Sequence, residues 1–208
     1  ILAWSSGING NLPFLVYFEK NYELGMDLAI LVFLLLAGVM EYGIASFTRF
    51  IDIGQKITNH KTPEDFNNQI KKMYWQQILI LFISSALAFV LIYYIINASW
   101  GFEGQFKETL VRLSIKVCVI GGAGYVLLAW GMLNSLYLFT LGQAKRPLQA
   151  IVSACLLNIV LGFFLSRFLA YEYSVVGMFC GAAIFVAITL KAMTHYFKNL
   201  DYHYYAAY

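Results

Sequence analysis

Five apolar runs, each close to the length of a bilayer crossing, dominate this sequence of 208 residues. A helix needs about 20 apolar residues to cross the hydrocarbon core. Because lipid offers the backbone no hydrogen-bond partners, a crossing segment is either a helix or a strand of a closed barrel. The uninterrupted apolar stretch at 28–37 excludes the alternation of a barrel strand. We therefore predict an all-α polytopic membrane protein whose helices cross at about 27–47, 78–97, 117–141, 148–170 and 175–197.

The composition excludes the main classes of soluble protein. Hydrophobic residues make up 61% of the chain and charged residues 12%, whereas soluble domains have roughly 45–50% and about 25%. The interior of a soluble domain of this size cannot hold so many apolar side chains. The net charge of +3 is too small to indicate a nucleic-acid partner.

No motif in the sequence indicates catalysis, a metal or a cofactor. The chain has no Walker loop, no His-Glu-x-x-His and no Gly-x-Ser-x-Gly elbow. The cysteines lie inside apolar runs at spacings that form no metal or redox motif, and the histidines are scattered along the chain. We therefore expect a protein that is not an enzyme. The cysteines are Cys118, Cys155 and Cys180, and the histidines are His60, His195 and His203.

The distribution of Lys and Arg among the loops predicts the orientation in the membrane. Loops on one side hold twice as many as loops on the other, and the richer side is expected to be cytoplasmic. This gives an outer segment at 1–26, a helical bundle at 27–197 and a cytoplasmic tail at 198–208. The richer set is Arg49, Lys56, Lys61, Lys71, Lys72, Lys145, Arg146 and Lys198, against Lys20, Lys107, Arg112 and Lys116.

The long inner connection at 48–77 has the pattern of an amphipathic helical hairpin. Thr62 can cap a helix, Pro63 suits its first position, and acidic residues follow. One interpretation is a pair of span extensions at the lipid headgroups, with basic side chains on anionic lipid. The other is a docking surface for a cytoplasmic partner protein. The basic candidates for either contact are Arg49, Lys56, Lys71 and Lys72.

Glu41 is the most costly residue in the predicted spans. A charged side chain inside a span costs on the order of 2.5–3.5 kcal/mol and usually faces a bundle interior or an aqueous path. Ala37 and Ala45 lie one turn to either side, so small residues leave room beside the carboxylate. We predict that Glu41 lines a substrate path. The alternative is that its side chain reaches toward the inner surface near Arg49.

Three further polar side chains share one face of the third span and are also candidates for the path. Trp130, Asn134 and Tyr137 follow at three- and four-residue spacing. The alternative is that Asn134 hydrogen-bonds a neighbouring helix. Asn158, in the fourth span, is a further candidate, although its neighbours Ala154 and Gly162 form the kind of stripe that packs helices together.

Glycines in two spans predict close helix packing. Gly121, Gly122 and Gly124 lie in the third span, and Gly177 and Gly181 form a Gly-x-x-x-Gly in the fifth.

The order of these features resembles the Pel exopolysaccharide transporter family (PelG), which is related to the multidrug/oligosaccharidyl-lipid/polysaccharide (MOP) flippases. The resemblance covers nearly the whole chain and rests on span order and short motifs. It is carried by a span headed by Asp27 and ending in Arg49, the basic hairpin to Gln77, the segment Leu133-Asn134-Ser135-Leu136-Tyr137 shortly before Lys145-Arg146, and the C-terminal Leu200-Asp201-Tyr202-His203-Tyr204-Tyr205.

This resemblance implies the C-terminal half of a protein of about twelve spans in the bacterial inner membrane. The opening segment at 1–26 would be the end of a preceding helix and its loop, and the bundle would be one of two around a central cavity. The implied function is export of a polysaccharide within a biofilm synthesis and secretion complex. The implied partners are membrane lipid, a cytoplasmic glycosyltransferase and a membrane subunit that binds cyclic di-GMP.

Two other functions remain open at this point. A lipid-linked oligosaccharide flippase, or another MOP-type transporter, would share the fold. A membrane glycosyl or acyl transferase would need an acidic or histidine cluster facing the outer loops, where Glu103 and Glu108 have no partner histidine in the sequence.

Overall fold

The computed structural model describes residues 19–56, 63–107 and 109–198, and within them the fold is helical with no strand. Five helices in this described part are long and apolar enough to cross a membrane. This confirms the predicted all-α class and the predicted number of spans, and makes the chain a multi-pass membrane protein. The spans are α2 (Lys20–Lys56), α3 (Pro63–Asn97), α5 (Arg112–Thr140), α6 (Lys145–Phe168) and α7 (Ser174–Lys198), joined by the short helices α4 (Phe102–Phe106) and η1 (Tyr171–Tyr173).

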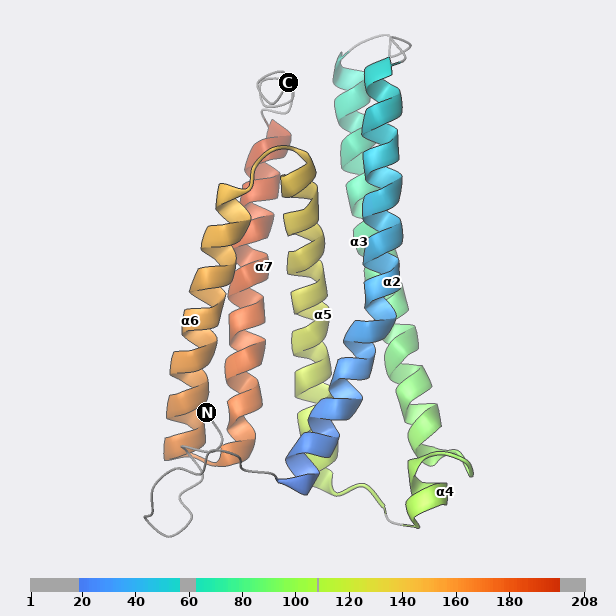
Figure 1. Cartoon of the computed structure of the whole chain (residues 1–208), viewed down its shortest axis with the longest axis vertical. Helices are drawn as coiled ribbons and strands as arrows, with labels where there is room; N and C mark the ends of the chain where they lie inside the picture. Colours follow the sequence, from blue (N-terminus) through green and yellow to red (C-terminus); the bar gives the residue numbers. More distant parts are fainter. Residues whose placement is uncertain (1–18, 57–62, 108, 199–208) are drawn as a thin grey trace.

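The five long helices alternate in direction and lie side by side (Figure 1). α5 packs against both α2 and α7, α6 packs along α7 and barely touches α5, and α3 lies along α2. We call the end where α2, α5 and α7 finish the basic end. The charged residues described there are Arg49, Asp52, Lys56, Glu64, Asp65, Lys71, Lys72, Lys145, Arg146, Lys191 and Lys198.

The first span is longer than the apolar run predicts, because packing extends it. α2 begins at Lys20 rather than at residue 27. A Cβ on Gly25 would lie 2.7 Å from the backbone oxygen of Ser114, so α2 and α5 are in close contact there. The Ser114 hydroxyl also donates a 2.8 Å hydrogen bond to the backbone oxygen of Asn21. Residues 20–26 of the predicted outer segment therefore belong to the first helix, and residues 1–18 lie outside the described part.

The described parts of the inner connection at 48–77, predicted as an amphipathic helical hairpin, continue the first two spans, as the interpretation of span extensions expects. α2 has 37 residues and α3 has 35, which makes each roughly 50–55 Å long at about 1.5 Å per residue. The hydrocarbon core is only about 30 Å thick. Pro63 is the first residue of α3, as its sequence context predicts. Figure 1 shows this pair of helices extending beyond the turn between α5 and α6.

The predicted glycine contacts are confirmed. A Cβ on Gly177 would lie 2.5 Å from the backbone nitrogen of Gly162, and one on Gly181 would lie 2.9 Å from the backbone oxygen of Ala154. A Cβ on Gly122 would lie 2.7 Å from the ring of Phe89. Glycine therefore permits the approach of α6 to α7 and of α5 to its neighbours.

Much of the apolar surface faces outward. Only 17% of the most apolar 18-residue stretch of α6 is buried against the rest of the chain. Its exposed face carries large apolar side chains along its whole length. An apolar surface of this extent is suited to lipid or to further helices rather than to water. The large apolar side chains exposed on α6 are Leu148, Ile151, Val152, Leu156, Ile159, Val160, Phe163, Phe164 and Phe168.

Candidate functional site

A chain of hydrogen bonds links three spans in the basic half of the bundle. The Tyr74 hydroxyl of α3 donates to Asn134 Oδ1 of α5 at 2.8 Å. Asn134 Nδ2 donates to Thr189 Oγ1 of α7 at 3.2 Å, and the Thr189 hydroxyl donates to the backbone oxygen of Phe185 at 2.8 Å. All three polar side chains belong to fully buried residues. We call Tyr74, Asn134 and Thr189 the polar relay.

Aromatic rings pack around the polar relay. The Tyr137 ring lies 4.0 Å from that of Phe47 and 5.6 Å from that of Tyr74, centroid to centroid, and the Tyr74 ring lies 5.2 Å from that of Phe197. The Tyr137 hydroxyl is buried and has no hydrogen-bond partner among the described residues. The site is therefore mostly apolar, with an unused polar atom beside the relay.

α3 reaches the relay mainly through long side chains. Its backbone follows α2 and approaches α5 at few positions. The buried Tyr74 and Ile78 belong to the same apolar cluster as Leu133 and Met193. Trp130 packs edge-on against Phe82 at 5.3 Å, and its indole N–H approaches the Tyr74 hydroxyl without forming a hydrogen bond. Side chains rather than close backbone packing thus hold α3 against α5 and α7.

The structure separates the predicted path residues into different environments. Within this bundle Asn134 and Tyr137 are completely buried, whereas Trp130 is half-buried. The alternative that Asn134 hydrogen-bonds neighbouring helices is confirmed. Asn158 lies where α6 crosses Gly181, whose Cβ would be 3.0 Å from that of Asn158. A role of these four residues in a path stays a prediction.

Glu41 lies apart from the polar relay, on the exposed face of α2. Its neighbours Met40 and Gly43 are buried toward the bundle, whereas Gly38, Tyr42 and Ala45 are exposed with it. A Cβ on Gly38 would have no atom within 4 Å. The carboxylate and the space beside it therefore face away from the other four spans.

The predicted basic surface residues lie at the basic end. Arg49 and Lys72 are exposed and Lys71 is half-buried, while Lys56 is the last residue of α2. They lie on the α2–α3 pair, as expected for the span extensions.

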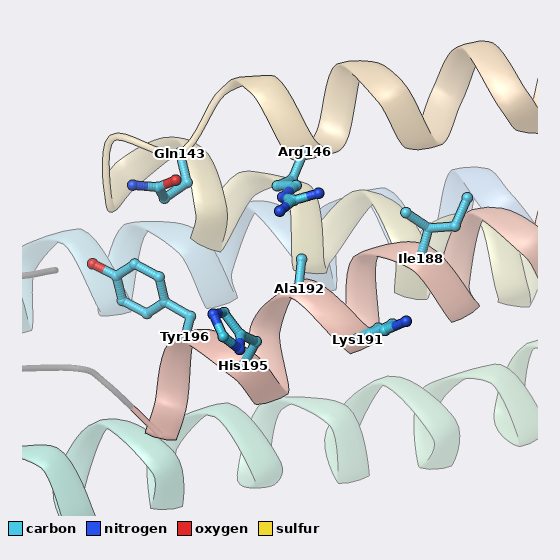
Figure 2. Close-up of a pocket in the computed structure, with 7 residues that line it drawn as sticks. All are labelled: Gln143, Arg146, Ile188, Lys191, Ala192, His195 and Tyr196. Atoms are coloured by element: carbon cyan, nitrogen blue, oxygen red, sulfur yellow. The ribbon is translucent and has the colours of Figure 1, made fainter.

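A second basic feature, which the sequence analysis did not single out, is a pocket of about 530 Å³ between the α5–α6 turn and the last turns of α7. Figure 2 shows Gln143 and Arg146 on one side and the α7 residues on the other. Its lining, within the described part of the chain, contains three basic side chains and no acidic one. The residues are Gln143, Arg146, Ile188, Lys191, Ala192, His195 and Tyr196.

Sequence reasoning also missed Tyr74 and Thr189 as partners of Asn134. The sequence signal that could have identified Tyr74 and Thr189 is that each of three helices carries a polar side chain at a similar distance along the helix from the basic end. Among the residues that the structure describes, no group of three or more His, Cys, Asp or Glu side chains is close enough to hold a metal ion.

Comparisons of the chain with protein-family models, with curated proteins and with solved structures gave no match.

Proposed function

We propose that this chain is the C-terminal bundle of a transporter that exports an exopolysaccharide of the Pel type across the bacterial inner membrane. It would act within a biofilm polysaccharide synthesis and secretion complex, without catalysing a reaction itself. The observation that carries the proposal is Glu41, a carboxylate on the outward face of a membrane-spanning helix.

The position of Glu41 requires a polar environment that these five spans do not provide. Eight residues separate it from Arg49, about 12 Å along the helix axis. Facing lipid, its charge would cost on the order of 2.5–3.5 kcal/mol. A second bundle, as in the MOP superfamily that the sequence resembles, would replace lipid on this face with protein and a water-filled cavity.

The surroundings of Glu41 suit a bulky polar passenger. Gly38 and Ala45 carry little or no side chain on the same exposed face, so they leave room about one turn to either side of the carboxylate. By the family resemblance, the polymer carries amino sugars that can be positively charged. A carboxylate in the path would attract such a passenger.

The polar relay supports a movable joint between α3 and the spans α5 and α7. Alternating access moves one group of helices against another around a fixed site. Because α3 is held to α5 and α7 through side chains such as Tyr74, α3 can shift against these two spans by breaking few contacts, whereas α2 stays closely packed on α5. Relay residues would then control the motion, while Glu41 faces the passenger.

The basic end provides the proposed cytoplasmic face. The positive-inside rule favours a cytoplasmic position for it, which puts the C-terminus inside. The α2 and α3 extensions would present Arg49, Lys56, Lys71 and Lys72 to membrane lipid, to a cytoplasmic glycosyltransferase or to a cyclic di-GMP-binding membrane subunit.

The test is secreted polysaccharide from cells that carry the full-length gene. Wild type, a gene deletion and Glu41→Gln are compared at matched membrane expression. Asp27→Asn is the matched control, since it removes the same charge from an exposed position near the other end of α2. We expect the deletion and Glu41→Gln to lose polymer, and Asp27→Asn to retain it.

The alternatives give different outcomes. Normal polymer from the deletion strain contradicts the exporter function. Loss in the deletion but not in Glu41→Gln leaves export intact and removes Glu41 from the path. Accumulation of lipid-linked oligosaccharide in membrane extracts of the deletion strain identifies a flippase instead.

A further inference from the structure

The basic pocket lies at the depth where lipid headgroups are expected. On α6, Arg146 and Arg167 bracket an uncharged stretch from Pro147 to Ser166, about 20 residues or 30 Å, which matches the hydrocarbon core. On α7, Lys191 is the first charged residue after the uncharged stretch that begins at Ser174. Arg146 and Lys191 therefore both lie at the boundary between hydrocarbon and headgroups.

The turn between α5 and α6 builds one wall of the pocket. The Gln143 N–H donates to the Leu138 oxygen at 2.8 Å and the Gly142 N–H to the Phe139 oxygen at 3.0 Å, the pair of bonds that closes a helix in a Schellman motif. Gly142 has a φ of 73°, a left-handed conformation that glycine adopts without strain. The turn thereby reverses the chain and brings Gln143 and Arg146 over α7 (Figure 2).

The electrostatics of the pocket favour an anion. Among the residues that the structure describes, Arg146, Lys191 and His195 line it together with no acidic residue, and neither Arg146 nor Lys191 forms an ion pair there. α6 also begins here, and no side chain caps its N-terminus at Ala144. The positive end of the helix dipole adds to the basic side chains.

An apolar groove of about 330 Å³ lies on the other side of the same turn, between α5 and α6. Adjacent residues of the turn line different cavities. Gln143 and Arg146 line the basic pocket, whereas the residues that follow them, Ala144 and Pro147, line the apolar groove. The groove exists because α6 packs on α7 and leaves α5 largely uncovered at this level. Its lining is almost wholly apolar: Met132, Ser135, Leu136, Phe139, Ala144, Pro147, Leu148, Ile151 and Phe185.

From the pairing of a basic pocket at headgroup depth with an apolar groove beside it, we propose that this chain holds an acidic phospholipid, its phosphate between Arg146 and Lys191 and an acyl chain in the groove. Basic pockets between spans are suited to anionic headgroups. Arg146 offers a guanidinium fork that matches phosphate oxygens, and Lys191 adds a second charge. This site is distinct from the predicted lipid surface on α2 and α3, and it does not depend on what the protein transports.

The test is native mass spectrometry of the full chain, purified in detergent, with phosphatidylglycerol and phosphatidylcholine added at equal concentrations. Arg146→Gln/Lys191→Gln removes two charges from the pocket. Lys145→Gln/Lys198→Gln removes two charges from exposed residues at the same end but outside the pocket. We expect wild type and the control to prefer phosphatidylglycerol, and the pocket variant to bind it about tenfold or more weaker.

Further measurements distinguish a bound phospholipid from other ligands. Equal loss in the two double variants, or no preference for phosphatidylglycerol over phosphatidylcholine, overturns the site. Glycerol phosphate that competes at the same concentration as the lipid overturns the acyl-chain contact. A diazirine-bearing phosphatidylglycerol provides a measurement on wild type alone, and crosslinks to residues outside both 132–151 and 185–196 would contradict the proposal.

Discussion

Tyr74 on α3 and Asn134 on α5 are joined by a buried 2.8 Å hydrogen bond across 60 residues of sequence. Asn134 in turn reaches Thr189 on α7, so one amide side chain connects three spans. Both relay partners of Asn134 are fully buried, and a polar atom that loses its partner there cannot be compensated by water. The relay is therefore both a source of stability and a point at which the spans can be uncoupled.

Tyr74→Phe is expected to lower the stability of the bundle. The ring and its packing are kept, but Asn134 Oδ1 loses its donor. Hydrogen bonds between membrane helices contribute about 0.6 kcal/mol on average and up to about 1.7, so we expect a loss in that range. Unfolding of the purified chain in detergent measures it. Tyr93→Phe, on an exposed side chain of the same helix, is the control, and an equal change in both variants would contradict a stabilising relay.

Gly177→Ala is expected to destabilise the contact between α6 and α7. The new Cβ would lie 2.5 Å from the Gly162 nitrogen and 2.6 Å from its Cα. These are backbone atoms, so the helices must move apart, at a cost of about 1–3 kcal/mol. Gly38→Ala, which meets no atom within 4 Å, is expected to leave stability unchanged or to raise it by up to about 1 kcal/mol. The same unfolding measurement compares the two, and a similar loss in both would refute the packing argument.

The sequence pattern was sufficient to predict the membrane spans but not to predict the polar relay. Apolar runs determine which segments cross a membrane, and the glycine pair Gly177 and Gly181 marked the α6–α7 contact correctly. The start of α2 at Lys20 was missed because the contact of Gly25 with Ser114 is tertiary. The polarity of Asn134 was visible in the sequence, but its partners Tyr74 and Thr189 follow from how the helices are rotated, which no local pattern specifies.

The basic pocket was missed for a related reason. Arg146 and Lys191 are 45 residues apart in the sequence and belong to different spans. They line the same pocket only because the turn at Gly142 reverses the chain between α5 and α6. Charge counting gives the side of the membrane on which a basic residue is expected, but not its neighbours.

Gly38→Leu tests whether the outward face of α2 is used in the whole transporter. Within this bundle a leucine there has free space, so folding should be unaffected. If the face beside Glu41 lines the polysaccharide path, the added side chain narrows it and secreted polymer should fall. Ala86→Leu, on the exposed face of α3, makes a matched change toward lipid and is expected to leave export normal. Equal export from both variants at equal expression would contradict a path along this face.

Single cysteines test the proposed orientation of the two ends. In a chain whose Cys118, Cys155 and Cys180 are replaced by alanine, Lys72→Cys lies on the α3 extension at the basic end, and Arg112→Cys lies at the start of α5 at the other end. Both positions are exposed. A maleimide that cannot cross the inner membrane, added to cells with a permeabilised outer membrane, is expected to label Arg112→Cys and to spare Lys72→Cys until the cells are lysed.

The reverse labelling would place the basic end outside and remove the basis for a cytoplasmic partner on α2 and α3. It would also move the proposed lipid site to the outer leaflet without altering its chemistry, since Arg146 and Lys191 would still lie together at the boundary between hydrocarbon and headgroups. Labelling of both positions in intact cells is incompatible with α3 as a span, because an odd number of crossings from 72 to 112 puts the two residues on opposite faces. The cysteine pair therefore tests the membrane crossing and its direction in one experiment.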